Sequence, residues 1–146
     1  MKQSSIDLLR SRFEKYPIVV SGPVPEEEID QAEHAVGVKL APDYRTFVAE
    51  FGGAMVGAYP VFGLRVSEVM GGSDFLVEQT RQYRDGRWPP TEKWAVISCD
   101  GAGNPIGMTD DGKIWISDHD ARVIEVIASS FEEFVLRLAR GESLLG

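Results

Sequence analysis

The sequence predicts an α+β fold in which an antiparallel β-sheet meander carries packed helices. Helical patterns fill most of the chain up to residue 84, four short apolar strands follow between residues 94 and 127, and a capped helix comes after them. The loops between these strands are too short for parallel crossovers, so neighbouring strands must be antiparallel. Helices first, then strands, then one helix are typical of an α+β domain. A chain of 146 residues can bury a real core, so we expect one domain spanning residues 1–146.

Apolar residues at helical spacing predict the helices that precede the sheet. The first is marked by Ile6, Leu9 and Phe13, which recur at the spacing of one helix face. The second follows Pro25 with three glutamates, which favour the positive end of a helix dipole, and stops at Gly37. The expected helices cover residues 2–15, 26–36, 42–51 and 73–84, with an extended connection at 16–25, a short strand at 58–64 and a loop at 84–90.

The apolar pattern predicts four strands of the sheet, at about residues 94–98, 105–109, 113–117 and 123–127. The Asp-Gly pair at residues 111–112 is a strong signal for a two-residue hairpin. That turn would place Met108 opposite Trp115, and Gly107 opposite Ile116, on adjacent strands.

Connectivity also predicts where the loops of the sheet lie. The 99–104 and 118–122 loops should lie at one edge of the sheet, and Asp110 and Asp111 at the opposite edge. After the last strand, Ser130 and Glu133 have the spacing of a capping box, so a helix should begin there.

Charge limits the classes of partner. Lys and Arg number 15 against 23 Asp and Glu, which gives a net charge of −8 at neutral pH. Such a chain is repelled by nucleic acid phosphates, whereas a basic protein would be steered toward it. No apolar run is long enough to span a membrane, and the N-terminus lacks the pattern of a secretory signal. A single cysteine excludes an internal disulfide, and we expect a cytoplasmic protein.

Three segments resemble motifs of the SUKH superfamily, which includes the fungal Smi/Knr cell-wall regulators. They are LAPDYRTFVAEFGG at residues 40–53, SCDGAGNPIGM at 98–108 and IASSFEEFV at 127–135. The motifs occur in the order and spacing of that family, and the resemblance spans about residues 26–139.

The resemblance implies an α+β fold, no catalytic activity and no cofactor. Many bacterial members of the superfamily are immunity proteins that bind and neutralise a cognate polymorphic toxin, often a nuclease. Others are regulatory interaction modules, as in the fungal relatives. The expected partner is therefore a protein, most simply a basic toxin domain, because the chain itself is acidic. The chain would act as a monomer or homodimer.

An acidic edge of the sheet is the expected contact surface for that partner. The loops at 99–104 and 118–122 bring carboxylates together at this edge, and the loop at 84–90 adds an aromatic side chain that suits a partner anchor. The candidate partner-binding residues are Trp88, Asp100, Asn104, Asp118, His119 and Asp120.

A metal-dependent hydrolase is the competing hypothesis for the same edge. Carboxylates with an imidazole could hold a divalent ion, and a poised His119 could act as a base. However, adjacent residues of an extended segment point to opposite faces, so residues 118–120 would need an irregular turn to converge. Asx turns that cap a β connection explain these aspartates more simply.

The remaining reactive-looking residues have structural explanations. The glycine-bearing loop at 100–104 precedes a strand, whereas a phosphate loop precedes a helix, so Gly103 and Asn104 are expected to supply left-handed backbone conformations. Cys99 has no flanking base and should be a half-buried small residue. Trp94 and Trp115 should pack on the sheet, and Trp88 could pack beneath its own loop instead of facing a partner.

Overall fold

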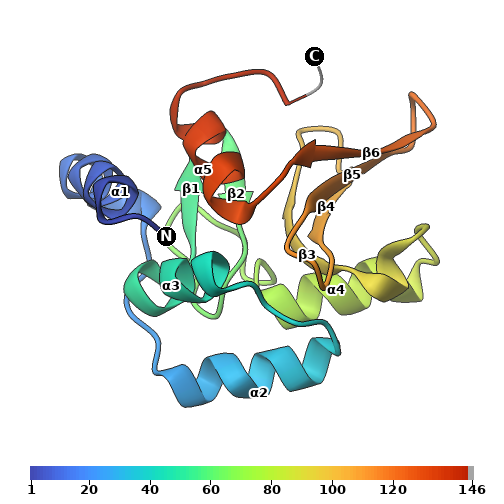
Figure 1. The fold of residues 1–146 in the computed structure, drawn as a ribbon, viewed down its shortest axis with the longest axis horizontal. Helices are drawn as coiled ribbons and strands as arrows, with labels where there is room; N and C mark the ends of the chain where they lie inside the picture. Colours follow the sequence, from blue (N-terminus) through green and yellow to red (C-terminus); the bar gives the residue numbers. More distant parts are fainter. Residues whose placement is uncertain (145–146) are drawn as a thin grey trace.

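The computed structural model describes residues 1–144 and shows helices packed on an antiparallel sheet (Figure 1). The α+β class is confirmed. In chain order the elements are α1 (Gln3–Lys15), a 3₁₀ turn (Pro17–Val19), α2 (Glu26–Val36), α3 (Pro42–Phe51), β1 (Ala54–Val56), β2 (Tyr59–Val61), α4 (Leu76–Asp85), a 3₁₀ turn (Thr91–Lys93), β3 (Ala95–Cys99), β4 (Pro105–Met108), β5 (Ile114–Asp118), β6 (Val123–Ala128) and α5 (Phe131–Ala139). No helix among these residues is long and apolar enough to cross a membrane.

The sheet is a six-stranded meander whose strands follow one another in chain order from β1 to β6. Each neighbouring pair is antiparallel, as predicted. β1 was not predicted, because three residues directly after a glycine pair are too few to show an alternating pattern. Val20 of the expected extended connection forms a bridge to Ala54 and covers the outer side of β1. β6, in contrast, is a terminal strand with one strand neighbour.

The register of β4 on β5 differs by one residue from the prediction. Gly107 lies opposite Trp115, and Met108 lies opposite Ile114. Because side chains alternate along a strand, this register puts Ile106 and Ile116 together on the face that carries the main hydrophobic core.

A three-residue loop causes the shift in register. The Thr109 N–H donates to the Lys113 carbonyl at 3.2 Å, so residues 110–112 form the loop instead of residues 111–112 alone. Gly112 has a φ of 83°, the left-handed position of a three-residue hairpin loop. The Asp111 carboxylate accepts hydrogen bonds from the Thr109 hydroxyl (2.6 Å) and from the Lys113 N–H (3.1 Å). This local bonding stabilises the longer loop over the two-residue turn.

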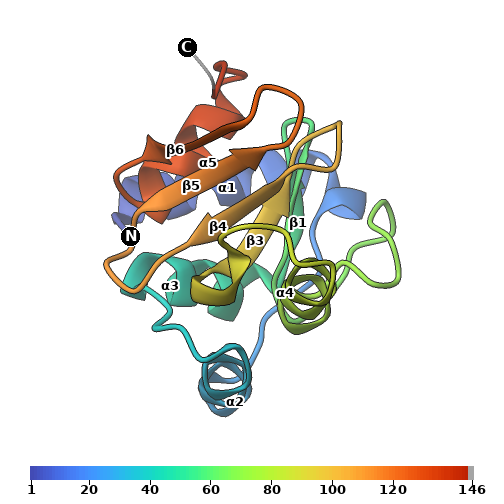
Figure 2. The same cartoon turned by 90° about the vertical axis from the view of Figure 1, so that its right-hand side faces the viewer.

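The two faces of the sheet are covered by different helices. Figure 2 shows α4 and the loop after it in front of the sheet, with α1 and α5 behind it. The rear face holds the main core, in which Phe131 of α5 packs edge-on against Tyr44 and Phe47 of α3. On the front face Trp94 lies against Gly107, where an added Cβ would come within 2.4 Å of the indole ring. The absence of a side chain at Gly107 therefore leaves room for the Trp94 ring on the sheet.

Both predicted helix ends have the expected capping groups. Gly37 ends α2 with a left-handed φ of 70°. The Ser130 hydroxyl accepts a hydrogen bond from the Glu133 N–H at 3.1 Å, and the Glu133 carboxylate in return accepts one from the Ser129 N–H at 2.8 Å. The bond from the Ser129 hydroxyl and the bond from its N–H lower the pKa of Glu133. The capping box therefore reaches one residue further upstream than the sequence spacing indicates.

Candidate functional site

The 99–104 and 118–122 loops meet at one edge of the sheet, as connectivity predicted, and Asn104 joins them. The Asp100 carboxylate accepts hydrogen bonds from the Ala102 N–H (3.0 Å), the Asn104 N–H (2.8 Å) and the Asn104 side-chain amide (2.8 Å). The Asn104 side-chain oxygen accepts the His119 N–H at 2.9 Å. Asn104 is buried, with 3% of its surface exposed. Its amide therefore fixes the position of one loop relative to the other.

The backbone prediction for this loop is half right. Gly103 has a φ of 83°, in the left-handed region. Asn104 is not among the residues of positive φ, so its predicted left-handed conformation is wrong. It precedes Pro105, and the residue before a proline is restricted to extended conformations. Its side chain serves as the link between loops instead.

The aspartates at the two edges of the sheet are bound to nearby backbone groups. The Asp118 carboxylate accepts hydrogen bonds from the N–H groups of Asp120 (3.0 Å) and Ala121 (2.9 Å), which is the expected Asx turn. At the opposite edge Asp110 accepts the Lys39 N–H at 2.8 Å. Asp120 is exposed at the tip of its loop. Its carboxylate is therefore accessible to a partner from the solvent.

Trp88 is part-buried and held by polar contacts on the front face of the sheet. Its indole N–H donates to the Ser117 hydroxyl at 3.0 Å, and this hydroxyl donates to the Pro89 carbonyl at 2.7 Å. The ring lies edge-on to Tyr83, with centroids 5.6 Å apart, and tilted against His119 at 5.5 Å. Trp88 thus packs under its loop and also presents part of its ring to solvent. The two predicted roles, packing beneath the loop and facing a partner, are therefore compatible.

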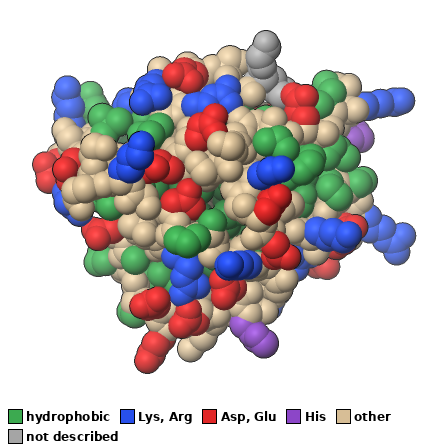
Figure 3. All heavy atoms as spheres, in the orientation of Figure 1, with side chains coloured by type: hydrophobic (Ala, Val, Ile, Leu, Met, Phe, Trp, Pro, Cys, Tyr) green, Lys and Arg blue, Asp and Glu red, His purple; other side chains and the backbone are tan. Residues whose placement is uncertain are grey.

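A groove with a volume of about 400 Å³ runs beside Trp88 across β5 and β6. Its floor includes Ser117 and Ile124, which are cross-strand partners, and Ile124 is 48% exposed. Figure 3 shows hydrophobic side chains gathered on the right of the view, where β5 and β6 lie. We call this feature the Trp88 groove and define it by Arg87, Trp88, Ser117, His119, Arg122 and Ile124.

Two arginines of the Trp88 groove carry no signal in the sequence. Arg87 and Arg122 have φ angles of 55° and 54°, and within residues 1–144 they are the non-glycine residues of positive φ. This conformation costs an ordinary residue about 1 kcal/mol or more. Both side chains are exposed, and neither guanidinium has an ion pair or hydrogen bond within the described chain. The sequence did not predict them because an arginine in a loop gives no indication of a left-handed backbone conformation.

The geometry does not supply a ligand set for the hydrolase hypothesis. Among residues 1–144 no group of three or more His, Cys, Asp or Glu side chains is arranged to hold a metal ion. Burial raises the pKa of the Cys99 thiol to about 11, so it is protonated at neutral pH and a poor nucleophile. Burial likewise raises the pKa of Tyr83 to about 12, and its hydroxyl donates to the Gly103 carbonyl at 2.7 Å. Tyr83 therefore acts as a structural hydrogen-bond donor.

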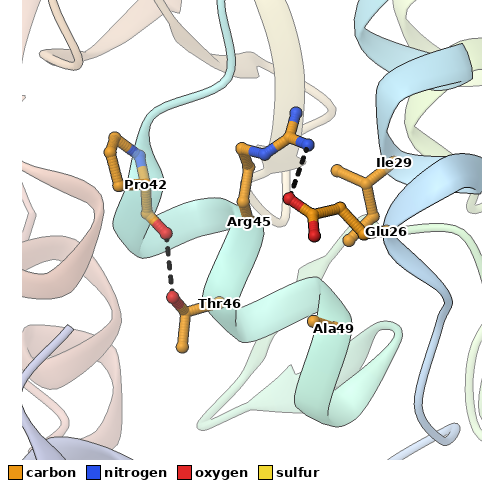
Figure 4. A pocket seen from close by; sticks show the side chains of 6 residues that line it. All are labelled: Glu26, Ile29, Pro42, Arg45, Thr46 and Ala49. Atoms are coloured by element: carbon orange, nitrogen blue, oxygen red, sulfur yellow. Dashed lines mark hydrogen bonds and ion pairs between the residues drawn. The ribbon is translucent and has the colours of Figure 1, made fainter.

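A second, more acidic surface lies on α2 and α3. Residues 23–53 carry seven acidic and two basic residues, a net charge of −5 out of the chain's −8. Figure 3 shows acidic side chains gathered at the bottom of the view, over α2. Arg45 lies near three of them, at 3.7 Å from Glu26 and 3.4 Å from Glu33, with Asp30 as a third partner. Figure 4 shows the groove of about 390 Å³ between the two helices, with Arg45 paired to Glu26 across it.

A family model described as the SMI1 / KNR4 family (SUKH-1) matches residues 23–137. The chain belongs to this family. The match covers most of the chain and confirms the resemblance that the three motifs indicate. No curated protein matches the chain. Membership of the SMI1 / KNR4 family supports a non-catalytic domain of SUKH type, and such domains generally bind protein partners.

Replacing Asn104 with Ala is expected to lower the free energy of unfolding by about 1–3 kcal/mol, because it removes a partner from the part-buried His119 N–H and from the Asp100 carboxylate. Asn104→Asp keeps the acceptor for His119 but sets a second carboxylate against Asp100, so its deficit should shrink as the pH falls and one carboxylate is protonated. Urea unfolding across a pH series measures both effects. Asp120→Ala, which removes an exposed carboxylate from the neighbouring loop, is the matched control. An equal loss in the control would contradict the linking role of Asn104.

Proposed function

We propose that this chain is an immunity protein, which binds and neutralises a cognate polymorphic toxin in the cytoplasm. Membership of the SMI1 / KNR4 family is the observation that carries the proposal. The acidic surface of α2 and α3 supports a basic toxin domain, such as a nuclease, because charge complementarity speeds association and disfavours wrong partners. Neutralisation would then be steric, by covering the toxin's active surface, and would need no catalytic group or cofactor in this chain.

The proposed contact surface includes the sheet edge predicted from the sequence. The carboxylates of Asp100 and Asp118 accept hydrogen bonds from backbone N–H groups at 2.8 Å and 3.0 Å, so these acidic side chains are held in fixed positions at the edge. A preformed edge lowers the entropy cost of binding. We propose that Trp88, Asp100, Asp118, His119 and Asp120 contact the toxin, and that the buried Asn104 contributes by holding their loops together.

Co-expression tests this function directly. The product of a neighbouring large toxin-like gene should arrest growth when produced alone, and co-production of this chain should restore growth. The purified proteins should form a complex whose association slows as salt is added, because steering by exposed charges is screened. Glu27→Lys, at an exposed acidic position of α2, should slow association more than Lys93→Glu, at an exposed position of the 3₁₀ turn outside α2 and α3, speeds it. Stable folding without binding or protection would exclude the immunity role for that pair and favour a regulatory role.

A further inference from the structure

The proposed function does not explain why Arg87 and Arg122 have left-handed backbone conformations. A glycine at either position would adopt the same backbone without the steric cost. The chain instead places Arg87 after α4 and Arg122 in the β5–β6 turn, and both line the Trp88 groove. Backbone strain concentrated at one groove, from two separate loops, indicates that the side chains have a use there.

The chemistry of the groove has an apolar part and a cationic part. Trp88 and the half-exposed Ile124 offer apolar surface, and Val126, 43% exposed, extends it along β6. The guanidinium groups of Arg87 and Arg122 have no partner in the described chain. The carboxylate of Asp118, which also lines the groove, already accepts two backbone hydrogen bonds. Aromatic and arginine side chains around an apolar floor are the usual composition of a binding hot spot.

We infer that the Trp88 groove holds a segment of a protein partner in which an apolar side chain is flanked by carboxylates. The apolar side chain would lie between Trp88 and Ile124, and the carboxylates would pair with Arg87 and Arg122, whose planar guanidinium groups suit bidentate bonds. The inference rests on the proposed function only in that the chain binds a protein. It goes further by stating the chemistry of the segment that is bound.

The occupant follows from charge complementarity. Away from the groove the protein is strongly acidic, so a basic partner would be steered to α2 and α3, whereas the free guanidinium groups select the opposite charge locally. A nucleic acid strand would also offer anions, but the net charge of −8 opposes it. A second copy of the chain would meet Glu125, the acidic residue in the middle of the terminal strand β6. A charge at this position is a known means of preventing two sheet edges from pairing.

Synthetic peptides provide the probe. An octapeptide that alternates Glu and Val is compared with one that alternates Lys and Val and one that alternates Glu and Ser. The three tryptophan indole N–H signals in a two-dimensional NMR spectrum report the place of binding. The Glu–Val peptide should shift the signal of Trp88 and leave that of Trp94, which is 2% exposed under α4, unchanged. The other two peptides should bind more weakly by about tenfold or more.

Glycine variants test the two arginines without a cost in folding. Arg87→Gly and Arg122→Gly introduce a residue that adopts the left-handed backbone without steric cost, so both variants should retain the wild-type Tm. Each should weaken binding of the Glu–Val peptide by about fivefold to thirtyfold, the range for loss of a charged interfacial hydrogen bond. Arg81→Ala removes an exposed arginine from α4, outside the groove, and should leave affinity unchanged.

Several outcomes would overturn the inference. These are equal binding of the Lys–Val peptide, wild-type affinity in both glycine variants, and a peptide-free dimer whose formation shifts the Trp88 signal. The peptide result is independent of the toxin. A chain that binds the Glu–Val peptide but not the toxin keeps this inference and loses the immunity role. A toxin bound equally well by the wild type and by the double glycine variant keeps the immunity role and removes this inference for that partner.

Discussion

Gly52→Ala is expected to lower the free energy of unfolding by roughly 3–5 kcal/mol, a large part of the stability of an ordinary domain. Gly52 has a φ of 76°, so alanine there pays the left-handed cost of about 1 kcal/mol. A Cβ would also lie 2.0 Å from the Gly22 carbonyl oxygen, which is a backbone atom that cannot rotate away. Overpacking of this kind forces the backbone to move. Urea unfolding of the purified variant measures the loss.

Gly37→Ala separates the two causes. Gly37 has a nearly equal φ of 70°, but nothing lies within 4 Å of its added Cβ. It should therefore show only the conformational cost of about 1 kcal/mol. If Gly52→Ala is no worse than Gly37→Ala, the close backbone approach is unimportant.

The position of Gly52 explains why the clash should be costly. Its carbonyl accepts the Leu64 N–H at 2.8 Å and the Arg65 N–H at 3.2 Å, so the backbone after β2 is bound to the end of α3. Gly63 lies against the same carbonyl, where its added Cβ would be 1.9 Å away. The connection before α2 is tied in as well, because the Gly22 N–H donates to the Phe51 carbonyl at 2.9 Å. Three chain segments therefore depend on one glycine lacking a side chain.

The fold was predictable wherever a local pattern determines the structure. Helical spacing located α1, α2 and α3, and short loops required the antiparallel order of β3 to β6. Predictions failed where a side chain overrode the local rule or where an element was too short to follow one. Asp111 bound the loop around it and lengthened a two-residue turn to three, and β1 was too short to have a pattern of its own. Register and very short strands depend on such contacts and not on periodicity.

The candidate site was predictable only in its placement. Connectivity brought the loops of Asp100 and His119 to one edge of the sheet, where the structure also has them. The buried link through Asn104 and the groove beside Trp88 depend on side-chain packing across loops distant in sequence. The left-handed conformations of Arg87 and Arg122 have no composition signal at all. Features of this kind become visible only when the chain is folded.

The family motifs mainly report packing, and Phe131 shows why. Phe131 belongs to the SFEEF segment and Tyr44 to the PDYRTF segment, and the two rings meet edge-on at 5.1 Å. Phe131 also contacts Phe47 at 5.3 Å, and all three side chains are fully buried. Two motifs that are far apart in the sequence thus form one aromatic cluster between α3 and α5. Motifs that build the scaffold identify the family without specifying its partner.

Phe131→Ala is accordingly expected to lower the free energy of unfolding by about 3–5 kcal/mol, the usual cost of emptying an aromatic site in a core. Phe131→Leu, which fills most of the space but loses the edge-on pairs, should cost roughly 1–2 kcal/mol. Urea unfolding followed by tryptophan fluorescence measures both. Similar losses for the two variants would contradict a role for volume and assign the stabilisation to the aromatic contacts alone.

The Phe131→Ala variant also tests whether packing in the core affects binding in the Trp88 groove. Phe131 begins α5, which lies behind the sheet in Figure 2, whereas Trp88 and Ile124 line the groove on the opposite face. Mutations at separated sites without shared partners usually have additive effects. The folded fraction of Phe131→Ala should therefore bind the Glu–Val peptide with wild-type affinity, and the apparent affinity should fall only by the fraction that is unfolded. A larger fall would mean that the aromatic cluster on the rear face holds the groove in shape through the sheet.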